Sequence, residues 1–312
     1  NENPFDWQKF IDSQNLFWQY PVWTERQFYQ QVKNSSNYAG FPWATILDKR
    51  VPGWNAESLI PRLKSNFDPG ISYITSCQHI RFRELKNACK QFNIKVLYTS
   101  HKRIGEDWLG DYGDTELRAC PLFAVNIEDE RRNQIFQSID LLSRHRKYLY
   151  SFVGSYKPDC YISPIRKNIF DMKHPKDAYI SRTEHWHFKD IVYHPKQNVD
   201  MQLNETGEYK HQCKHYNEIL LNSRFSLCPS GTGPNSIRFW ESLGAGSIPV
   251  LLSDTLELPD YVDLDWSQGI IRVKESKFQE IPDILREITP EEERARREMC
   301  LKLYDHYRQY YY

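Results

Sequence analysis

The segment Phe225–Asp254 constrains the fold most, because it joins two apolar runs through a loop of small residues and a helical segment. The runs, Phe225–Cys228 and Ile248–Leu252, have the length of buried strands. Between them lie Gly, Pro, Ser and Asn residues and then a segment that carries Arg238 and Glu241. This order predicts a strand, a loop, a helix and a second parallel strand.

The loop between these runs has the composition of an anion-binding turn. Small residues let a backbone approach a ligand closely, and free N–H groups at a helix start attract phosphate oxygens. The small residues here are Ser230, Gly231, Gly233, Asn235 and Ser236. Arg238 can add a bidentate contact to phosphate, and Glu241 on the same helix face can accept from sugar hydroxyls. The pieces suit a nucleoside diphosphate attached to a sugar.

The motif alone leaves two interpretations open. No Gly-Lys-Ser/Thr follows the loop, so it is not a Walker motif, and the dinucleotide fingerprint needs a different glycine spacing. A Gly/Ser loop before a helix is often an ordinary turn, and an Arg–Glu pair at i, i+3 is often a surface ion pair.

Apolar runs alternate with amphipathic segments along the rest of the chain. In the first half the expected strands are Ala44–Leu47, Ile71–Cys77, Lys95–Thr99 and Cys120–Val125, and the expected helices are Glu57–Phe67, Phe82–Phe92 and Asp129–Arg144. In the second half the further strands are Tyr148–Val153, Ala178–Ser181 and Ile270–Val273, and the helices are Ile162–Phe170, Tyr209–Leu221 and Thr289–Tyr310. Strands spaced by such helices predict βαβ units and parallel sheets. A restart near Arg144–Tyr148 predicts two Rossmann-like halves, for which 312 residues suffice.

Composition excludes several classes of protein. Lys+Arg equals Asp+Glu at 41 each, so no global field recruits nucleic acid or an anionic membrane. We expect no transmembrane segment, because no stretch approaches 18 uninterrupted apolar residues, and no signal peptide, because residues 1–30 are aromatic and polar without an apolar h-region. Seven scattered cysteines without a CxxC indicate reduced thiols and a cytoplasmic location. The alternative is the Golgi lumen, if an anchor upstream of Asn1 was removed, where the sequons at Asn34 and Asn204 would matter.

Two stretches resemble a known enzyme family. The residues SLCPSGTGPNSIRFWESLGAGSIPVLLSDTLELP, within Tyr216–Pro259, resemble the C-terminal signature of exostosin-type glycosyltransferases of family 47. SFVGS at Ser151–Ser155, followed by Arg166, resembles that family's glycine-ended strand and its trailing arginine. FPWATILD and CQHI are similar to short microbial or viral members. The resemblance implies a GT-B fold of two Rossmann-like domains facing a central cleft, a donor that is usually a UDP-sugar, inversion at the anomeric carbon and no obligatory metal.

The resemblance also implies a division of the chain. We expect residues 1–146 to form an acceptor-binding domain and residues 147–288 to form the nucleotide-sugar-binding domain. Residues 289–312 open with Thr-Pro-Glu-Glu, which is typical of a helix start. In the resembling fold such a last helix packs back on the N-terminal domain.

Donor-site roles follow from the same resemblance. Arg166 and Arg238 match the family's phosphate-contacting arginines, and Glu241 matches its ribose-binding glutamate. Gly154 ends the first strand of the donor half, and Asp254 belongs to the loop that lines the donor pocket. Fixed cations and amides can stabilise the charge that develops on the leaving UDP. The alternative for Arg166 is a solvated helix residue beside Lys167.

Three residues that follow apolar runs of the first half are candidate bases. Ligands bind outside the carboxyl ends of parallel strands, and Asp48, His79 and His101 are expected at such ends. An inverting transfer needs a base that removes a proton from the acceptor hydroxyl. Asp48 is the first choice, because we expect it to end the first strand and face the cleft. A histidine would titrate near neutral pH without special burial. Each of the three has a turn or cap role as its alternative.

Two histidine clusters are the alternative metal sites. They are His185, His187 and His194, and His211, Cys213 and His215. The first lacks a carboxylate at motif spacing, and in the second Cys213 lies off the helix face that the two histidines share. The chain also lacks a clear Asp-x-Asp, and Asp111-Tyr-Gly-Asp114 has the composition of a turn. We expect no metal and no cofactor beyond the donor.

These expectations describe an inverting, metal-independent glycosyltransferase. It would move a sugar, xylose or galactose by family prevalence, from a UDP-sugar to a hydroxyl of an oligosaccharide or other glycan. The alternatives are a non-catalytic nucleotide-sugar-binding subunit and a nucleotide-sugar epimerase on the same fold. Release of UDP with and without an acceptor distinguishes the three.

Overall fold

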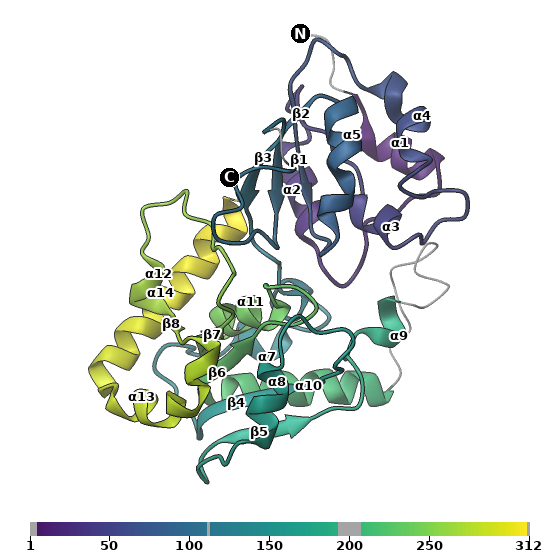
Figure 1. The fold of residues 1–312 in the computed structure, drawn as a ribbon. Coiled ribbons are helices and arrows are strands. Elements are labelled where there is room, and N and C mark those ends of the chain that lie inside the picture. The colour runs from purple at the N-terminus through teal and green to yellow at the C-terminus, as the bar shows by residue number, and fades with distance from the viewer. Residues whose placement is uncertain (1–4, 111–112, 193–206, 311–312) are drawn as a thin grey trace. The chain divides into compact units, whose positions relative to one another are not determined.

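The computed structural model describes residues 5–110, 113–192 and 207–310, and the chain divides into two compact units. The described residues of the first unit fall within 1–122, 190–203 and 257–259, and those of the second within 123–189, 204–256 and 260–312. Each unit contains one parallel sheet (Figure 1). The fold is therefore α/β with Rossmann-like parallel sheets, as the sequence predicts. The arrangement of the two units as GT-B lobes stays a prediction.

The sheet of the first unit has the order β1-β2-β3. Its strands are β1 (Tyr73–Cys77), β2 (Ile94–Thr99) and β3 (Glu116–Ala119). Its helices are α1 (Trp7–Ser13), α2 (Thr24–Val32), α3 (Trp43–Leu47), α4 (Leu59–Leu63) and α5 (Lys86–Gln91), with 3-10 turns η1 (Lys64–Asn66) and η2 (Phe82–Leu85). The short helix α9 (Lys189–Val192) begins in the second unit and ends in the first. The register pairs Cys77 with Thr99 and Thr99 with Ala119, so the three strands end at one edge.

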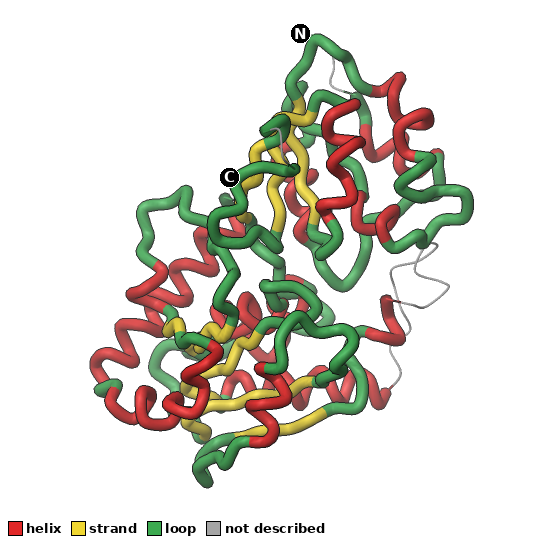
Figure 2. The backbone as a smooth tube through the Cα atoms, viewed as in Figure 1, coloured by secondary structure: helices red, strands yellow, loops and turns green. Residues whose placement is uncertain are grey.

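The sheet of the second unit has the order β5-β4-β6-β7-β8 (strands in yellow in Figure 2). Its strands are β4 (Tyr148–Gly154), β5 (Tyr179–Arg182), β6 (Ser223–Pro229), β7 (Ile248–Leu252) and β8 (Ile271–Arg272). Its helices are α6 (Val125–Glu128), α7 (Gln134–Gln137), α8 (Ile165–Asp171), α10 (Gly207–Leu221), α11 (Ile237–Gly244), α12 (Trp266–Gly269), α13 (Ile281–Glu287) and α14 (Pro290–Gln309), with the 3-10 turn η4 (Glu275–Glu280). Every residue of β7 is buried, which explains its continuous apolar run.

The strand expected at Ala44–Leu47 is a helix, α3, so this prediction is wrong. The buried carboxylate of Glu25 accepts the backbone N–H of Ala44 at 3.1 Å, which satisfies a donor in the first turn of the helix. Asp48 is consequently the C-terminal cap of α3, with its N–H bonded to the carbonyl of Ala44, and it does not end a strand. A short apolar run carries no period that separates the two structures.

Two further expectations near the end of the first unit are also wrong. The strand is β3, Glu116–Ala119, rather than Cys120–Val125, because Pro121 has no N–H for a ladder. The long helix expected at Asp129–Arg144 is reduced to α7. There the side chain of Asp140 accepts the N–H groups of the residues two and three positions on, a local alternative to helix.

The division between the units differs from the boundary expected at residue 146. Residues 123–146 belong to the second unit, where Phe136 packs with Leu220, Leu221 and Ala245 in one apolar cluster. The last helix, α14, is capped by Thr289 as expected, since its hydroxyl accepts the N–H of Glu292. We expected α14 on the first domain, but its contacts with α11, α12 and β7 assign it to the second unit.

All seven cysteines are free thiols, and only Cys160 is exposed. In the described part of the chain no helix has the length and apolar character needed to cross a bilayer.

Candidate active site

The carboxyl edge of the second sheet holds two arginines against one aromatic ring. Arg166 of α8 and Arg238 of α11 lie over Phe152 of β4, with their guanidinium carbons 5.8 and 4.6 Å from the ring centroid. A Cβ atom added to Gly154 would lie 3.0 Å from Nη2 of Arg238 and 3.6 Å from Nη1 of Arg166. Both guanidinium groups therefore reach the end of β4, where glycine leaves them room.

Backbone carbonyls hold Arg166, which is 7% exposed. Its Nε donates to the carbonyl of Ser230 at 2.8 Å and its Nη1 to the carbonyl of Ser155 at 3.2 Å. The guanidinium also lies 4.7 Å from the ring of Tyr161. Its Nη2, which would be 3.0 Å from a Cβ on Gly231, has no hydrogen-bond partner among the described residues. The solvated alternative for Arg166 is wrong, because the side chain is buried and directed.

Arg238 is less completely paired. Its Nη2 donates to the carbonyl of Val153, whereas its Nε is buried and has no partner within the described ranges. The aromatic face of Phe152 lies beneath the group and adds a cation–π contact. Both guanidinium groups thus lie beside Gly154, and each keeps one donor without a partner in the described ranges, Nη2 of Arg166 beside Gly231 and Nε of Arg238.

Neither cation is held by an ion pair with a described residue, although the charge of Arg238 acts on nearby Glu241. In the described part of the chain, no carboxylate forms an ion pair with either guanidinium. Burial, followed by the positive charge of Arg238, lowers the pKa of Arg166 to about 10. Two adjacent cations that are bonded to neutral carbonyls have the chemistry to bind an anion, because a phosphate can accept from both planar forks.

The loop after β6 is tightly folded around this pair. The N–H of Ser230 donates to the carbonyl of Leu252, and the N–H of Gly231 donates to that of Gly233. Asn235 turns inward instead of towards a ligand, because its Oδ1 accepts from Trp240 Nε1 and from the N–H of Ser236. The amide of Ser236 is therefore already used inside the protein.

Glu241 lies in a buried polar network behind Arg238. It is 3% exposed, and its two carboxylate oxygens accept from Asn126 at 2.8 Å and from the hydroxyl of Tyr216 at 2.6 Å. Burial raises the pKa of Glu241, and the bond from Tyr216 offsets part of that rise. The surface ion pair considered for Arg238 and Glu241 is therefore wrong, whereas a ribose contact of Glu241 stays a prediction.

A residue that sequence reasoning missed, Glu275, ties the strand-end loops together. Its carboxylate accepts from the hydroxyls of Ser163 and Ser230, and its N–H donates to the exposed side chain of Asp254 at 2.9 Å. Asp254 thus lies at the same edge of the sheet as the arginine pair. Glu275 lies three residues after the end of β8 in a charged segment, which gives no local signal of its role.

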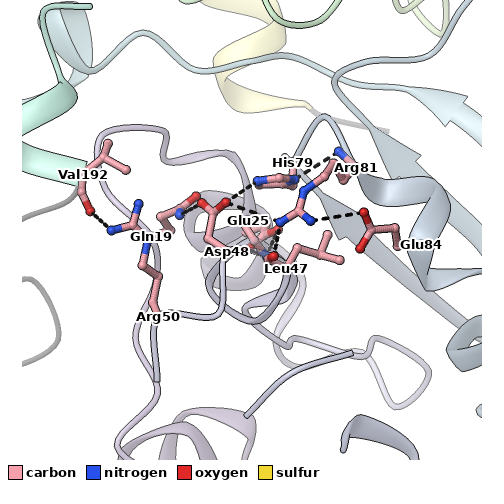
Figure 3. Close-up of polar contacts among 10 residues, drawn as sticks. Gln19, Glu25, Leu47, Asp48, Arg50, His79, Arg81, Glu84 and Val192 are labelled. Atoms are coloured by element: carbon pink, nitrogen blue, oxygen red, sulfur yellow. Dashed lines mark hydrogen bonds and ion pairs between the residues drawn. The ribbon is translucent and has the colours of Figure 1, made fainter. Parts of the chain in front are cut away.

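The first unit holds a second polar cluster around Asp48 (Figure 3). Oδ1 of Asp48 is 2.8 Å from Nε2 of His79, and Oδ2 accepts from Nε2 of Gln19. Arg81 Nη2 lies 3.8 Å from Oδ1. The side chain of Asp48 is 24% exposed and that of His79 is 12% exposed, so a ligand can reach the carboxylate. Asp48 and His79 thus belong to one cluster.

Backbone contacts define the tautomer of His79. The N–H of Arg81 donates to Nδ1 at 3.0 Å, so in the neutral ring the proton is on Nε2 and donates to Asp48. Burial alone would raise the pKa of Asp48, but the hydrogen bonds from His79 and Gln19 outweigh it and hold the pKa below its ordinary value. Asp48 is therefore an ionised acceptor whose position is fixed from two sides.

Glu25 supports this cluster from beneath. It is 1% exposed and accepts from the N–H groups of Gln78 and Ala44, which follow β1 and begin α3. Burial raises the pKa of Glu25 to about 8. Through these bonds one carboxyl fixes the two segments that carry His79 and Asp48.

His101 is separated from solvent. It follows β2 as expected, but it is 4% exposed, and burial lowers its pKa to about 3. Its Nδ1 has no hydrogen-bond partner in the part of the chain that the structure describes. The enclosed imidazole favours Asp48 over His101 as the base, and the choice among the three candidates stays a prediction.

The described histidines and Cys213 of the two candidate metal clusters do not converge on a common point. Cys213 is buried and donates to Asn126, and His215 pairs with the hydroxyl of Tyr179. His194 and Asp111 lie outside the described residues. No group of three metal-ligating side chains occurs in the described ranges. The expectation of metal-free chemistry stays a prediction.

The family model that matches this chain falls mainly on the second unit. A model of the Exostosin GT47 domain matches residues 119–288. Exostosin-1 of Drosophila melanogaster is 32% identical over 165 residues, which cover 52% of this chain and 21% of that protein. The Exostosin-1 homolog of Caenorhabditis elegans is 30% identical over 191 residues, or 61% of this chain and 48% of that protein. Exostosin-1c of Danio rerio is 33% identical over 162 residues, or 52% and 21%. The chain spans less than half the length of each of these relatives.

Proposed function

The chain belongs to the exostosin GT47 family, and on that premise we propose that it is a glycosyltransferase. In this proposal it moves a sugar from a UDP-sugar to a hydroxyl of a glycan acceptor, inverts the anomeric centre and needs no metal. The observation that carries the proposal is the pair Arg166 and Arg238, two cations beside Gly154 with open donors and no ion-pair partner in the described ranges.

The arginine pair is proposed to hold the diphosphate. As the bond between the anomeric carbon and the UDP oxygen breaks, its electron pair passes to the diphosphate, whose charge rises. Arg166 and Arg238 are fixed by the carbonyls of Ser230, Ser155 and Val153, so they need no reorganisation to meet that charge. Two guanidinium groups can supply the positive charge that a divalent cation supplies in metal-dependent transferases.

Asp48 is proposed as the base. The acceptor oxygen forms a bond to the anomeric carbon while its proton passes to Asp48, and UDP leaves from the opposite face, which inverts the centre. His79 cannot take that proton in its neutral form, because Nδ1 accepts from Arg81 and the Nε2 proton already points at Asp48. His79 instead orients the carboxylate. Xylose and galactose are the first sugars to test.

Replacement of Arg238 by alanine tests this proposal. Arg238→Ala should lower UDP release from the cognate UDP-sugar by about 10²-fold or more, because a fixed donor to the leaving group is lost. UDP should also no longer raise the unfolding temperature of this variant. Lys167→Ala is the matched control, since Lys167 is exposed on α8 and pairs with Asp171. An Arg238→Ala variant that transfers sugar at the parental rate would contradict the proposed site.

The same assay separates the proposal from its alternatives. Acceptor-dependent UDP release with a glycosylated product supports a transferase. Binding of UDP-sugar without turnover would indicate a binding subunit, and conversion of the donor sugar without an acceptor would indicate an epimerase.

A further inference from the structure

The chain that leaves β5 passes directly beside the arginine pair. Arg182, the last residue of β5, is in register with Gly154, and the N–H of Thr183 donates to the carbonyl of Gly154 at 2.8 Å. The hydroxyl of Thr183 donates to the carbonyl of His185 at 3.0 Å, which fixes the turn that follows. The segment Thr183–Phe188 therefore starts at the edge of the sheet where Arg166 and Arg238 lie.

Trp186 in this segment has a fixed orientation and an open surface. Its side chain is 42% exposed. Its ring meets that of Phe188 at 5.7 Å with an interplanar angle of 69°, an edge contact. Phe188 is itself buried and lies 5.5 Å from the guanidinium carbon of Arg132. The edge contact holds Trp186 without covering both faces of its indole.

Trp186 follows the strand beside the one that ends at the arginine pair. Arg166 is bonded at the end of β6 and Arg238 at the end of β4, while Trp186 follows β5, the next strand. Strands lie about 4.8 Å apart, so β6 and β5 are separated by roughly 10 Å along this edge. A nucleotide whose diphosphate lies at the end of β4 and β6 would extend its base along this edge, towards the chain that leaves β5. Single exposed aromatics are common, so the position of Trp186, more than its exposure, carries the argument.

We infer that Trp186 is the platform on which the planar base of the nucleoside diphosphate stacks. This inference rests on the proposed function, because it assumes that the arginine pair binds the diphosphate. Stacking on an indole face uses the π surface that every base has, so Trp186 contributes affinity without selecting uracil. The site is thus one for a nucleoside diphosphate in general, and selection of the base falls to other groups.

Calorimetric titration of the whole chain with UDP, GDP and inorganic pyrophosphate tests the inference. Trp186→Ala should weaken UDP and GDP binding by roughly 5- to 150-fold, the usual effect of removing one stacking aromatic. It should leave pyrophosphate binding unchanged, because pyrophosphate has no base. Trp186→Phe should retain most of the affinity for UDP. Trp108→Ala is the matched control, because Trp108 is also exposed but belongs to the first unit.

Each result decides the inference. Equal affinity of Trp186→Ala and the parent chain for UDP overturns it and leaves the donor site intact, provided that binding still depends on Arg238. An equal loss of affinity for UDP and for pyrophosphate in Trp186→Ala also overturns it, because the segment Thr183–Phe188 would then affect the diphosphate and not the base. If the parent chain binds none of the three ligands, the proposed donor site fails and the inference fails with it.

Discussion

The two polar clusters differ in how their charges are balanced. Around Asp48, the negative carboxylate accepts from His79 and Gln19 and lies near Arg81. Around Gly154, Arg166 and Arg238 bond only to neutral carbonyls. Charges without an opposite partner are costly when buried and are usually kept for a ligand. The charge of Asp48 is therefore already balanced by its neighbours, whereas in the proposed function a bound diphosphate balances the charges of Arg166 and Arg238.

The largest effect expected from this contrast is on chemistry rather than on binding. Asp48→Asn removes the proton acceptor but keeps a side chain of the same shape, so turnover should fall by about 10²- to 10⁴-fold. The affinity for UDP should not change, because the carboxylate does not contact the donor in this proposal. Turnover and UDP titration on the same preparation measure both. Full activity of Asp48→Asn would show that the base lies elsewhere.

A smaller effect is expected where the arginine pair meets the backbone. Gly154→Ala places a methyl group 3.0 Å from Nη2 of Arg238, so that side chain must shift. We expect UDP binding to weaken by about fivefold, or about 1 kcal/mol, measured by calorimetry. Gly207→Ala is the control, because a Cβ there meets no described residue within 4 Å. If both alanine variants bind UDP like the parent, Gly154 does not position the pair.

The smallest effect concerns pH. The folded pKa of Asp48 lies below its unfolded value near 3.9, so ionised Asp48 contributes stability above about pH 4. That contribution is lost as the pH falls through the folded pKa, and activity should fall with it. His79→Gln removes the main cause that lowers the pKa of Asp48. The pH below which the turnover rate falls should therefore be higher in this variant than in the parent chain.

Rate profiles from about pH 3 to 8 measure this shift. His211→Gln, on the exposed side of α10, is the control and should leave the pH of this fall unchanged. A turnover rate that falls at the same pH in His79→Gln and the parent would show that Asp48 does not act as the base.

The sequence predicted those parts whose signals are local. The loop and helix at 225–254 form as expected, and Thr289 caps α14 through its own hydroxyl. Asp48 and His79 were both expected near the site, but Asp48 was assigned to a strand that is a helix. The helix starts there because Glu25, distant in sequence, accepts the N–H of Ala44. No local pattern encodes that contact.

The partners of the site residues were beyond sequence reasoning for the same reason. Gln19 bonds Asp48, and Glu275 bonds Ser230, across separations of 29 and 45 residues. The burial of His101 and the inward turn of Asn235 also depend on neighbours from other segments. The local sequence indicates which residues could act in a site, whereas tertiary packing determines which of those residues a ligand can reach.

The position of α14 bears on how this protein can be dissected. The stretch that matches the family model stops at residue 288, immediately before this helix. Yet Tyr307 meets Trp240 at 6.1 Å, Arg297 donates to the carbonyl of Gly246, and Glu293 pairs with Arg224. A fragment trimmed to the matched boundary would leave a tryptophan and several backbone groups bare to water. The residues that match the family model are therefore fewer than the residues that the second unit needs for its core, which include α14.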